Sequence, residues 1–447
     1  MKAGDEVTLT GGDLAFGGDC VCRTGGRFVV FVPYLSPGDA ARVRIGHVRP
    51  NFARGEAVEL VSPGPERAVP PCRWFGECGG CQWMHVTTDS QRSAKERIVR
   101  TMLAQLGLGG KVEPIRGADP LGYRNRLVLP VRAGAAGLEA GFFRSRSHSI
   151  VEVDSCAVQR PLLWEVSREA LRLMRASGLP GWDEETGRGF FRHLVVRCAA
   201  GTGEAGVIIV TSDGEFPGGG EMAEELMKSV PAVKGVSRNI NPDRTNVILG
   251  RKTLPLAGAG HLREEIGGMV LRASLTAFFQ ANHAVTGEML KILREWTAGG
   301  SGGILDLYCG VGLLGLAAAG ETATWLAGIE EEESAVADAR ANAEARGVGR
   351  AFFRAGTVES VLPNLLRETG TPGTVILDPP RKGLTPAALA AVLAVKAPLV
   401  IYVSCDPATF SRDLRGLAAS GYRLETAVPL DMFPQTYHIE LMAKLRR

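Results

Sequence analysis

From about residue 283 onward, strand-like apolar segments alternate with Ala- and Leu-rich helical segments, and this alternation limits the fold more than any other feature. The strand-like segments read ILDLYC, TWLAGI, TVILD and PLVIYVS. Such alternation is typical of a parallel sheet with helices on both faces. The last two segments, YRLETAVPL and HIELMAKL, are joined by a short link, so we expect them to close the sheet as an antiparallel pair. The sequence predicts a doubly wound α/β domain over residues 276–447.

The first 62 residues predict a different kind of structure. Short alternating segments between Gly- and Pro-rich turns, without a helical period, are typical of a small β-barrel of the OB type. Strand-like and helical segments mix over residues 63–275, which predicts a central α+β domain. A helix expected over residues 89–108 could pack on the C-terminal domain. A chain of 447 residues is long enough for these three domains.

The composition is that of a soluble globular protein. The N-terminus lacks the apolar segment of a signal peptide, and no run of about 18 uncharged apolar residues occurs, so we expect a cytoplasmic protein without membrane contact. The net charge is +3, but residues 41–55 hold four Arg and no acid, and residues 123–148 hold five Arg against one Glu. Such strips suit a phosphate backbone, although an Arg-rich sequence produces them by chance about as often.

A glycine-rich segment, DLYCGVGLLG, begins at Asp306 between a predicted strand and a predicted helix. Gly310 and Gly312 let the backbone turn tightly beside a ligand, and Glu330, at the end of the next strand, can bind ribose hydroxyls. The run also fits a dinucleotide fingerprint, so it predicts a nucleotide ligand without naming it. Asp306 favours S-adenosylmethionine (SAM), because a carboxylate there would repel a pyrophosphate but could hold the methionine amino group.

Two later strand ends carry candidate functional residues. Asp378 begins an Asp-Pro-Pro-Arg segment of the kind that nucleic-acid methyltransferases often place against the target base. Cys405, in IYVSCDP, follows an apolar strand at the edge where α/β active sites form. A lone cysteine is more often a small core residue, so only its neighbours favour a nucleophile.

Nine cysteines in a chain expected to be cytoplasmic favour metal or catalytic roles over disulfides. Cys72, Cys78 and Cys81 cluster as C-x5-C-G-G-C, and Cys156 supplies a fourth thiolate. The two glycines leave room for a cluster and free N–H groups for its sulfurs. The spacing fits an iron–sulfur cluster and a zinc site about equally.

Together these segments resemble the RNA uracil-5-methyltransferases, which act on 23S rRNA or tRNA. The resemblance extends over essentially the whole chain, and its N-terminal part is similar to a TRAM barrel. The matching segments, in order, are Pro71–Cys81 with Cys156, Tyr123–Arg126, Gly141–His148, Phe278–Asn282, Asp378–Arg381, Ser404–Pro407 and Asp431–Glu440.

The resemblance implies a Rossmann-like class I SAM methyltransferase domain, an RNA partner and a monomeric protein. It implies a nucleophile at Cys405 and a general base at Glu440. The implied SAM contacts are Gln280, Tyr308, Glu330 and Asp378, and a [4Fe–4S] cluster is implied on Cys72, Cys78, Cys81 and Cys156. The cysteine set and the barrel favour 23S rRNA, and the T-loop uridine of tRNA is the nearest alternative.

The chemistry of uracil explains why such residues are needed. Carbon 5 is a poor nucleophile until a thiolate adds at carbon 6, and a base must later remove the carbon-5 proton. We expect Arg381 and Lys382 to lower the pKa of Cys405. The target base must also be flipped out of its stack, with the barrel and the basic strips holding the flanking RNA.

Two other classes of protein are considered. An NAD-linked iron–sulfur oxidoreductase would use the glycine run and the four cysteines, but it leaves Ser404–Pro407 and His438–Glu440 without a role. A catalytically silent RNA-binding module is disfavoured by the presence of both Cys405 and Glu440.

Overall fold

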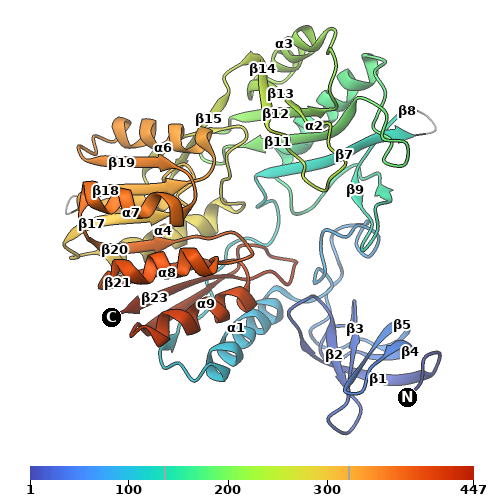
Figure 1. Cartoon of the computed structure of the whole chain (residues 1–447). Helices are drawn as coiled ribbons and strands as arrows, with labels where there is room; N and C mark the ends of the chain where they lie inside the picture. The colour runs from blue at the N-terminus through green and yellow to red at the C-terminus, as the bar shows by residue number, and fades with distance from the viewer. Residues whose placement is uncertain (135–136, 321–322) are drawn as a thin grey trace.

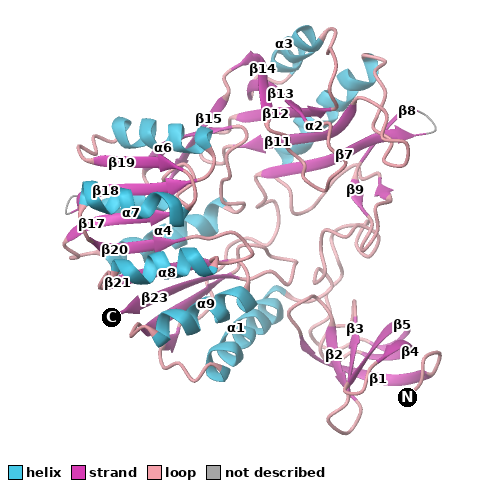
Figure 2. Cartoon of the chain, in the orientation of Figure 1, coloured by secondary structure: helices cyan, strands magenta, loops and turns pink. Residues whose placement is uncertain are grey.

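The computed structural model describes residues 1–134, 137–320 and 323–447. Its chain runs from a barrel through a central sheet to a C-terminal sheet covered by helices (Figures 1 and 2). No helix in these described ranges has the length and apolar character needed to cross a membrane.

The N-terminal barrel is closed, with strand order β1-β2-β3-β5-β4. In β4, Ala41, Val43 and Ile45 are buried while Arg42 and Arg44 are exposed, so the two-residue period of the sequence separates the barrel interior from solvent. This confirms the predicted barrel. The strands are β1 (Glu6–Leu14), β2 (Cys20–Arg23), β3 (Val29–Val32), β4 (Ala40–Val48) and β5 (Phe52–Ser62).

The central sheet has the order β14-β13-β12-β11-β7-β8, and two helices cover it. The β9–β10 hairpin extends beside it (Figure 1). The elements are β7 (Arg126–Gly134), β8 (Gly137–Ala140), β9 (Phe142–Phe143), β10 (Ile150–Val151), α2 (Pro161–Ala176), β11 (Phe191–Cys198), β12 (Ala205–Thr211), α3 (Gly219–Ser229), β13 (Val233–Ile240) and β14 (Lys252–Gly258).

The C-terminal sheet has the order β19-β18-β17-β20-β21-β23-β22-β6, with an apolar cluster on each face. Strands β17 to β21 are parallel, as predicted, and β23 runs antiparallel to both β21 and β22. The strands are β17 (Gly302–Leu307), β18 (Ala323–Glu330), β19 (Ala351–Ala355), β20 (Pro372–Leu377), β21 (Leu399–Ser404), β22 (Arg423–Leu430) and β23 (Glu440–Arg446). The helices are α4 (His283–Thr297), α5 (Leu313–Ala319), α6 (Glu333–Ala345), α7 (Val358–Thr369), α8 (Pro386–Val395) and α9 (Pro407–Ala419).

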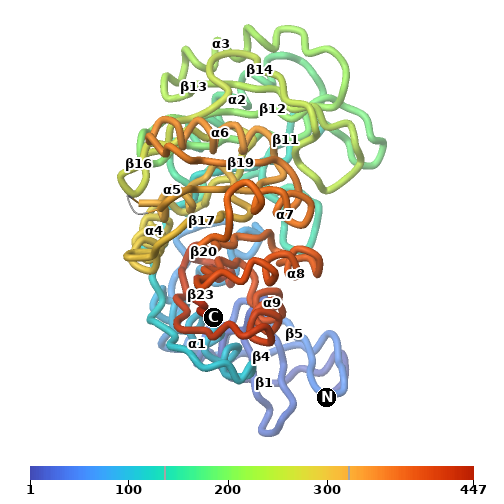
Figure 3. Tube along the Cα trace, turned by 60° about the vertical axis from the view of Figure 1, so that its left-hand side comes forward, coloured from blue at the N-terminus to red at the C-terminus, as the bar shows by residue number. Residues whose placement is uncertain are grey.

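Three segments from earlier in the chain join this C-terminal body. Helix α1 (Thr88–Gln105) buries Val99 and Leu103 in the same cluster as the β21 residue Tyr402, and it lies beside the C-terminal strands in two views (Figures 1 and 3). The short β6 (Lys111–Val112) pairs with β22 and extends the sheet. The hairpin β15 (His261–Ile266) and β16 (Met269–Ser274) packs on α6, where Arg272 pairs with Asp338 at 2.9 Å.

Candidate active site

The register of β21 against β23 places the two candidate catalytic residues opposite each other. Ser404 pairs with Leu441 in this antiparallel ladder, so Cys405 and Glu440 occupy the next facing positions. The parallel pair β20–β21 ends at Leu377 and Tyr402, which places Asp378 on the neighbouring strand. Three candidate side chains distant in sequence therefore meet at one edge of the sheet.

The glycine-rich turn after β17 follows the local rules of a nucleotide site. Gly312 has φ 85°, which favours glycine, and a Cβ at Gly315 would lie 2.8 Å from Asp306 Oδ2. Tyr308 has φ 65°, a conformation that costs energy for a residue with a Cβ. The turn therefore holds a strained backbone at the end of the strand where ligands of α/β sheets bind.

Asp306 lies buried below this turn. Its Oδ2 accepts a hydrogen bond from the Gly315 N–H at 2.7 Å, while its Oδ1 has no hydrogen-bond partner among the described residues. Burial raises the pKa of Asp306 to about 8, and the carboxylates of Asp378 and Glu330 act in the same direction. An unpartnered buried acceptor is compatible with the cationic amino group of a methionine.

Glu330 and Gln280 are held by contacts within the same edge. Glu330 accepts hydrogen bonds from the Gly310 N–H and the Glu332 N–H, each at 3.0 Å. Gln280 donates from Nε2 to Asp378 Oδ2 at 3.1 Å. Burial raises the pKa of Asp378 to about 7, with a contribution from Glu330. All predicted SAM contacts therefore fall at the ends of β17, β18 and β20 or beside them.

The pKa of Cys405 differs from the sequence-based expectation. Burial, first, and the Glu440 and Asp378 carboxylates together raise it to about 11 against the opposing effect of Arg381. Glu440 is itself buried, and burial together with Asp378 raises its pKa well above the usual range, again against Arg381. The expected lowering by Arg381 and Lys382 was wrong, because desolvation and two carboxylates outweigh the cation.

The segment preceding Glu440 is fixed by residues from other parts of the chain. Asp431 accepts from the buried Lys95 Nζ at 2.7 Å, and Lys95 also donates to the Phe433 carbonyl at 3.0 Å. The Tyr123 hydroxyl donates to the Pro434 carbonyl at 3.0 Å. These contacts tie the catalytic edge to α1 and to the segment before β7.

Gln435 makes the most extensive of these connections. Its backbone N–H donates to Gln91 Oε1 and its Oε1 accepts from Gln91 Nε2, both at 2.9 Å. Its carbonyl accepts from the backbone N–H groups of Gln82 and Trp83, both at 3.0 Å. The sequence analysis did not predict the contacts of Gln91 and Lys95 with the segment before Glu440. The only related sequence signal was the Asp431–Glu440 segment, which contains their partners.

The four predicted cluster cysteines line one cavity of about 100 Å³, together with Arg124. Burial, first, and the neighbouring thiols together raise the pKa of Cys81 to about 12 against the opposing effect of Arg124. The Gly80 N–H donates to Cys78 Sγ at 3.4 Å. Among the described residues, no group of three or more His, Cys, Asp or Glu side chains has the arrangement of a site for a metal ion. The four thiols and the sulfur-directed N–H fit the donor chemistry of an iron–sulfur cluster.

Most arginines of the two basic strips pair with acids from other parts of the chain. Arg42 and Arg44 pair with Glu6, and Arg54 pairs with Asp19 at 2.9 Å. In the second strip, Arg132 pairs with Glu184, Arg144 with Glu77 and Arg146 with Asp19. Each strip therefore carries less free positive charge than its sequence indicates.

Known proteins share both parts of this architecture. Residues 2–58 match the TRAM domain family, and residues 262–359 and 366–447 match the tRNA (Uracil-5-)-methyltransferase family. An uncharacterized RNA methyltransferase of Halalkalibacterium halodurans is 36% identical over 449 residues, covering 100% of this chain and 98% of that relative. One of Nostoc sp. is 36% identical over 448 residues, covering 99% and 96%.

A solved structure has the same arrangement over the full chain. The tRNA (uracil-54, C5)-methyltransferase of Pyrococcus abyssi, in complex with S-adenosyl-L-homocysteine, is 27% identical with a TM-score of 0.76, covering 98% of this chain and 100% of that one. The fold and the site thus define a SAM-dependent RNA methyltransferase. The chain belongs to the RNA uracil-5-methyltransferase family and carries an N-terminal TRAM domain. Family membership selects SAM over NAD as the ligand of the glycine-rich turn.

Proposed function

We propose that this enzyme methylates carbon 5 of a uridine in 23S rRNA through a covalent adduct between Cys405 and carbon 6. The observation that carries the proposal is the β21–β23 register, because it sets a thiol and a carboxyl group opposite each other at the SAM-binding edge. SAM supplies the methyl group as an electrophilic sulfonium.

In this proposal the protein residues perform three tasks. SAM is bound by residues at the ends of the parallel strands and beside them, namely Gln280, Asp306, Tyr308, Gly310, Gly312, Glu330 and Asp378. The Cys405 thiolate adds to carbon 6 of the flipped uracil, which makes carbon 5 nucleophilic. Glu440, as a carboxylate, then removes the carbon-5 proton, the carbon 5–carbon 6 double bond re-forms, and the thiolate leaves.

The raised pKa values are consistent with this sequence of steps. In the free enzyme, the Cys405 proton is favoured by burial and by Glu440. Burial and Asp378 raise the pKa of Glu440, so its carboxylate is a stronger base for the carbon-5 proton.

We propose that Cys72, Cys78, Cys81 and Cys156 hold a [4Fe–4S] cluster that supports folding and RNA placement. The shared cavity and the N–H directed at Cys78 support it. Anaerobically purified protein should contain about four iron and four sulfide ions per chain, and each Cys→Ser variant should lose them. Colourless protein with stoichiometric zinc would instead identify a zinc site.

We further propose units over residues 1–62 for RNA binding, 63–275 for the cluster and 276–447 for catalysis, in a cytoplasmic monomer. The barrel and the cysteine set favour 23S rRNA. The tRNA T-loop uridine is the second candidate, because the Pyrococcus abyssi structure is that of a tRNA (uracil-54, C5)-methyltransferase. Methylation of separate 23S rRNA and tRNA transcripts with labelled SAM, followed by mapping of the product, distinguishes the two.

The covalent mechanism has a direct test. Cys405→Ala should bind SAM and RNA without forming an adduct, whereas Glu440→Gln should methylate and then retain the RNA covalently. RNA containing 5-fluorouridine should trap the wild type, since the fluorine cannot leave as a cation. Turnover by Cys405→Ala, or failure of the wild type to crosslink to fluorinated RNA that it binds, would refute the adduct.

A further inference from the structure

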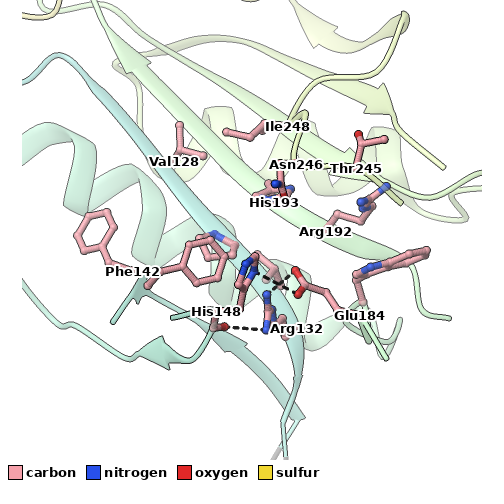
Figure 4. A pocket seen from close by; sticks show the side chains of 14 residues that line it. Val128, Arg132, Phe142, His148, Glu184, Arg192, His193, Thr245, Asn246 and Ile248 are labelled. Carbon is pink, nitrogen blue, oxygen red and sulfur yellow. Dashed lines mark hydrogen bonds and ion pairs between the residues drawn. The ribbon is translucent and has the colours of Figure 1, made fainter. Parts of the chain in front are cut away.

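A second pocket lies in the central sheet, outside the methyltransferase site. It encloses about 380 Å³ between β7, β11 and three loops that contain His148, Glu184 and Asn246 (Figure 4). This volume lies in the range of pockets that bind small ligands. None of its lining residues has a role in the proposed methyl transfer.

The floor of the pocket presents buried polar atoms that lack partners. The Arg192 guanidinium stacks 4.5 Å from the Trp182 ring centroid and donates from Nη1 to the Asp243 carbonyl at 2.7 Å. Arg192 is only 5% exposed, yet its Nε has no hydrogen-bond partner among the described residues. His193 Nδ1 is likewise buried and unpartnered within those ranges. Burial of polar atoms without partners is costly, and both atoms belong to side chains that line the pocket.

The mouth of the pocket carries two aromatic rings and a carboxylate, Glu184, that contacts two other side chains. The Phe143 and His148 rings lie 5.6 Å apart, and the Arg132 guanidinium lies 5.2 Å from the Phe143 centroid. Arg132 and His148 both converge on Glu184, as Figure 4 shows. Burial and the adjacent Arg192 and Arg132 lower the pKa of His193 to about 4, so its ring is neutral near pH 7 and offers both a donor and an acceptor.

The loop at this mouth also contacts the barrel and the cysteine segment. The Phe143 carbonyl accepts from the Gly79 N–H at 2.9 Å. Arg146, three residues along, lies 3.9 Å from Asp19 of the barrel. The loop at the mouth of the pocket therefore contacts both the barrel and the cysteine segment.

We infer that this pocket binds one unpaired nucleotide of the substrate RNA, with its base against Phe143 and His148 and its polar edge toward the side chains of Arg192 and His193. Aromatic rings recognise the faces of unstacked bases, and arginine recognises their edges and phosphates. The inference rests on the proposed function for the identity of the RNA. It adds a second contact that would help select the correct RNA.

The test combines kinetics with photocrosslinking on the full-length protein. In a Phe143→Ala/His148→Ala double variant, KM for the methylated transcript should rise roughly tenfold, as expected for a lost base stack. The kcat at saturating RNA and the KM for SAM should not change. Asn246→Ala, at the pocket wall, should also raise the RNA KM, whereas its exposed neighbour Val247, which does not line the pocket, serves as the matched control through Val247→Ala.

Crosslinking decides the inference even where a variant fails to fold. A short oligouridylate containing 4-thiouridine, irradiated with the wild type, should attach to peptides spanning residues 142–148, 182–184 or 245–248. Crosslinks confined to other peptides would overturn the inference, whatever the variants do to KM. Absence of methylation of both transcripts would refute the proposed function instead, and the crosslink position would still decide the pocket.

Discussion

The pKa of Cys405 is set by groups that act in opposite directions and that come together only in the folded chain. Arg381, from the segment after β20, acts to lower its pKa, and Asp406 beside it caps α9 by accepting from the Ala408 and Thr409 N–H groups at 2.9 Å. The cation favours a thiolate. The opposing carboxyl group of Glu440 comes from another strand, so its effect on Cys405 follows from register and not from local sequence.

The first prediction concerns the reactivity of this thiol in the free enzyme. Because burial, Glu440 and Asp378 raise the pKa of Cys405 to about 11, its alkylation by iodoacetamide should be slow near neutrality and accelerate as pH rises. Glu440→Gln removes one cause, so the variant should react faster at the same pH. Mass spectrometry of the Cys405 peptide measures both rates. Equal rates in the two proteins would show that Glu440 does not act on the thiol.

The second prediction concerns Asp306. Its folded pKa of about 8 lies above the ordinary value of 3.8, so folding favours the protonated form. Its contribution to stability is therefore greatest below about pH 4 and is lost as pH rises toward 8. Asp306→Asn keeps an oxygen for the Gly315 N–H but cannot ionise. In urea unfolding, the free energy of unfolding of the variant relative to that of the wild type should rise by at least about 1.4 kcal/mol between about pH 4 and pH 8. A difference that does not change with pH would contradict the raised pKa.

At the scale of elements, the sequence predicted which segments form strands and helices better than it predicted which strands pair. The alternation after residue 283 predicted the parallel strands, and the short link predicted the antiparallel β22–β23 pair. Nothing local indicated that β23 inserts between β21 and β22, or that β6 adds a further strand. Such pairings depend on contacts between distant segments. The expected roles of Cys405 and Glu440 came from resemblance, and their facing positions came from the fold.

The third prediction concerns the segment before Glu440. Gln91→Ala would leave the Gln435 N–H and Oε1 and the carbonyls of Trp83 and Val86 without the Gln91 side chain. Loss of such buried hydrogen bonds costs about 1–3 kcal/mol, so the free energy of unfolding should fall by that amount. The kcat should fall as well, because Gln435 positions the strand that begins at Glu440. Urea unfolding and steady-state turnover measure the two effects.

Gln105→Ala is the matched control, since Gln105 is exposed at the end of the same helix. It should leave both quantities close to the wild-type values. An unchanged kcat in a destabilised Gln91→Ala protein would restrict these hydrogen bonds to a structural role.

At the scale of the whole molecule, the barrel and the catalytic body share a core. Trp83 is fully buried and belongs to the same apolar cluster as the barrel residues Leu9 and Val43 and the α1 residue Ala94. Its indole N–H donates to the Gly18 carbonyl at 3.0 Å, and its backbone N–H donates to the Gln435 carbonyl. The barrel is thus packed onto the enzyme through α1 and the segment before it. The Pro-rich composition of residues 62–71 did not indicate that the barrel packs on the rest of the enzyme.

The last prediction follows from that shared core. If Trp83 couples the two bodies, the barrel and the catalytic sheet should unfold in one thermal transition, because exposing Trp83 removes apolar burial from both at once. Trp83→Ala should separate the transitions and lower the midpoint of the barrel, since truncating a buried tryptophan costs about 3–5 kcal/mol. Calorimetry of the wild type and the variant measures this. A distinct low-temperature barrel transition in the wild type would mean that the barrel is an independent unit, and RNA bound to it would then reach the active site only through a flexible connection.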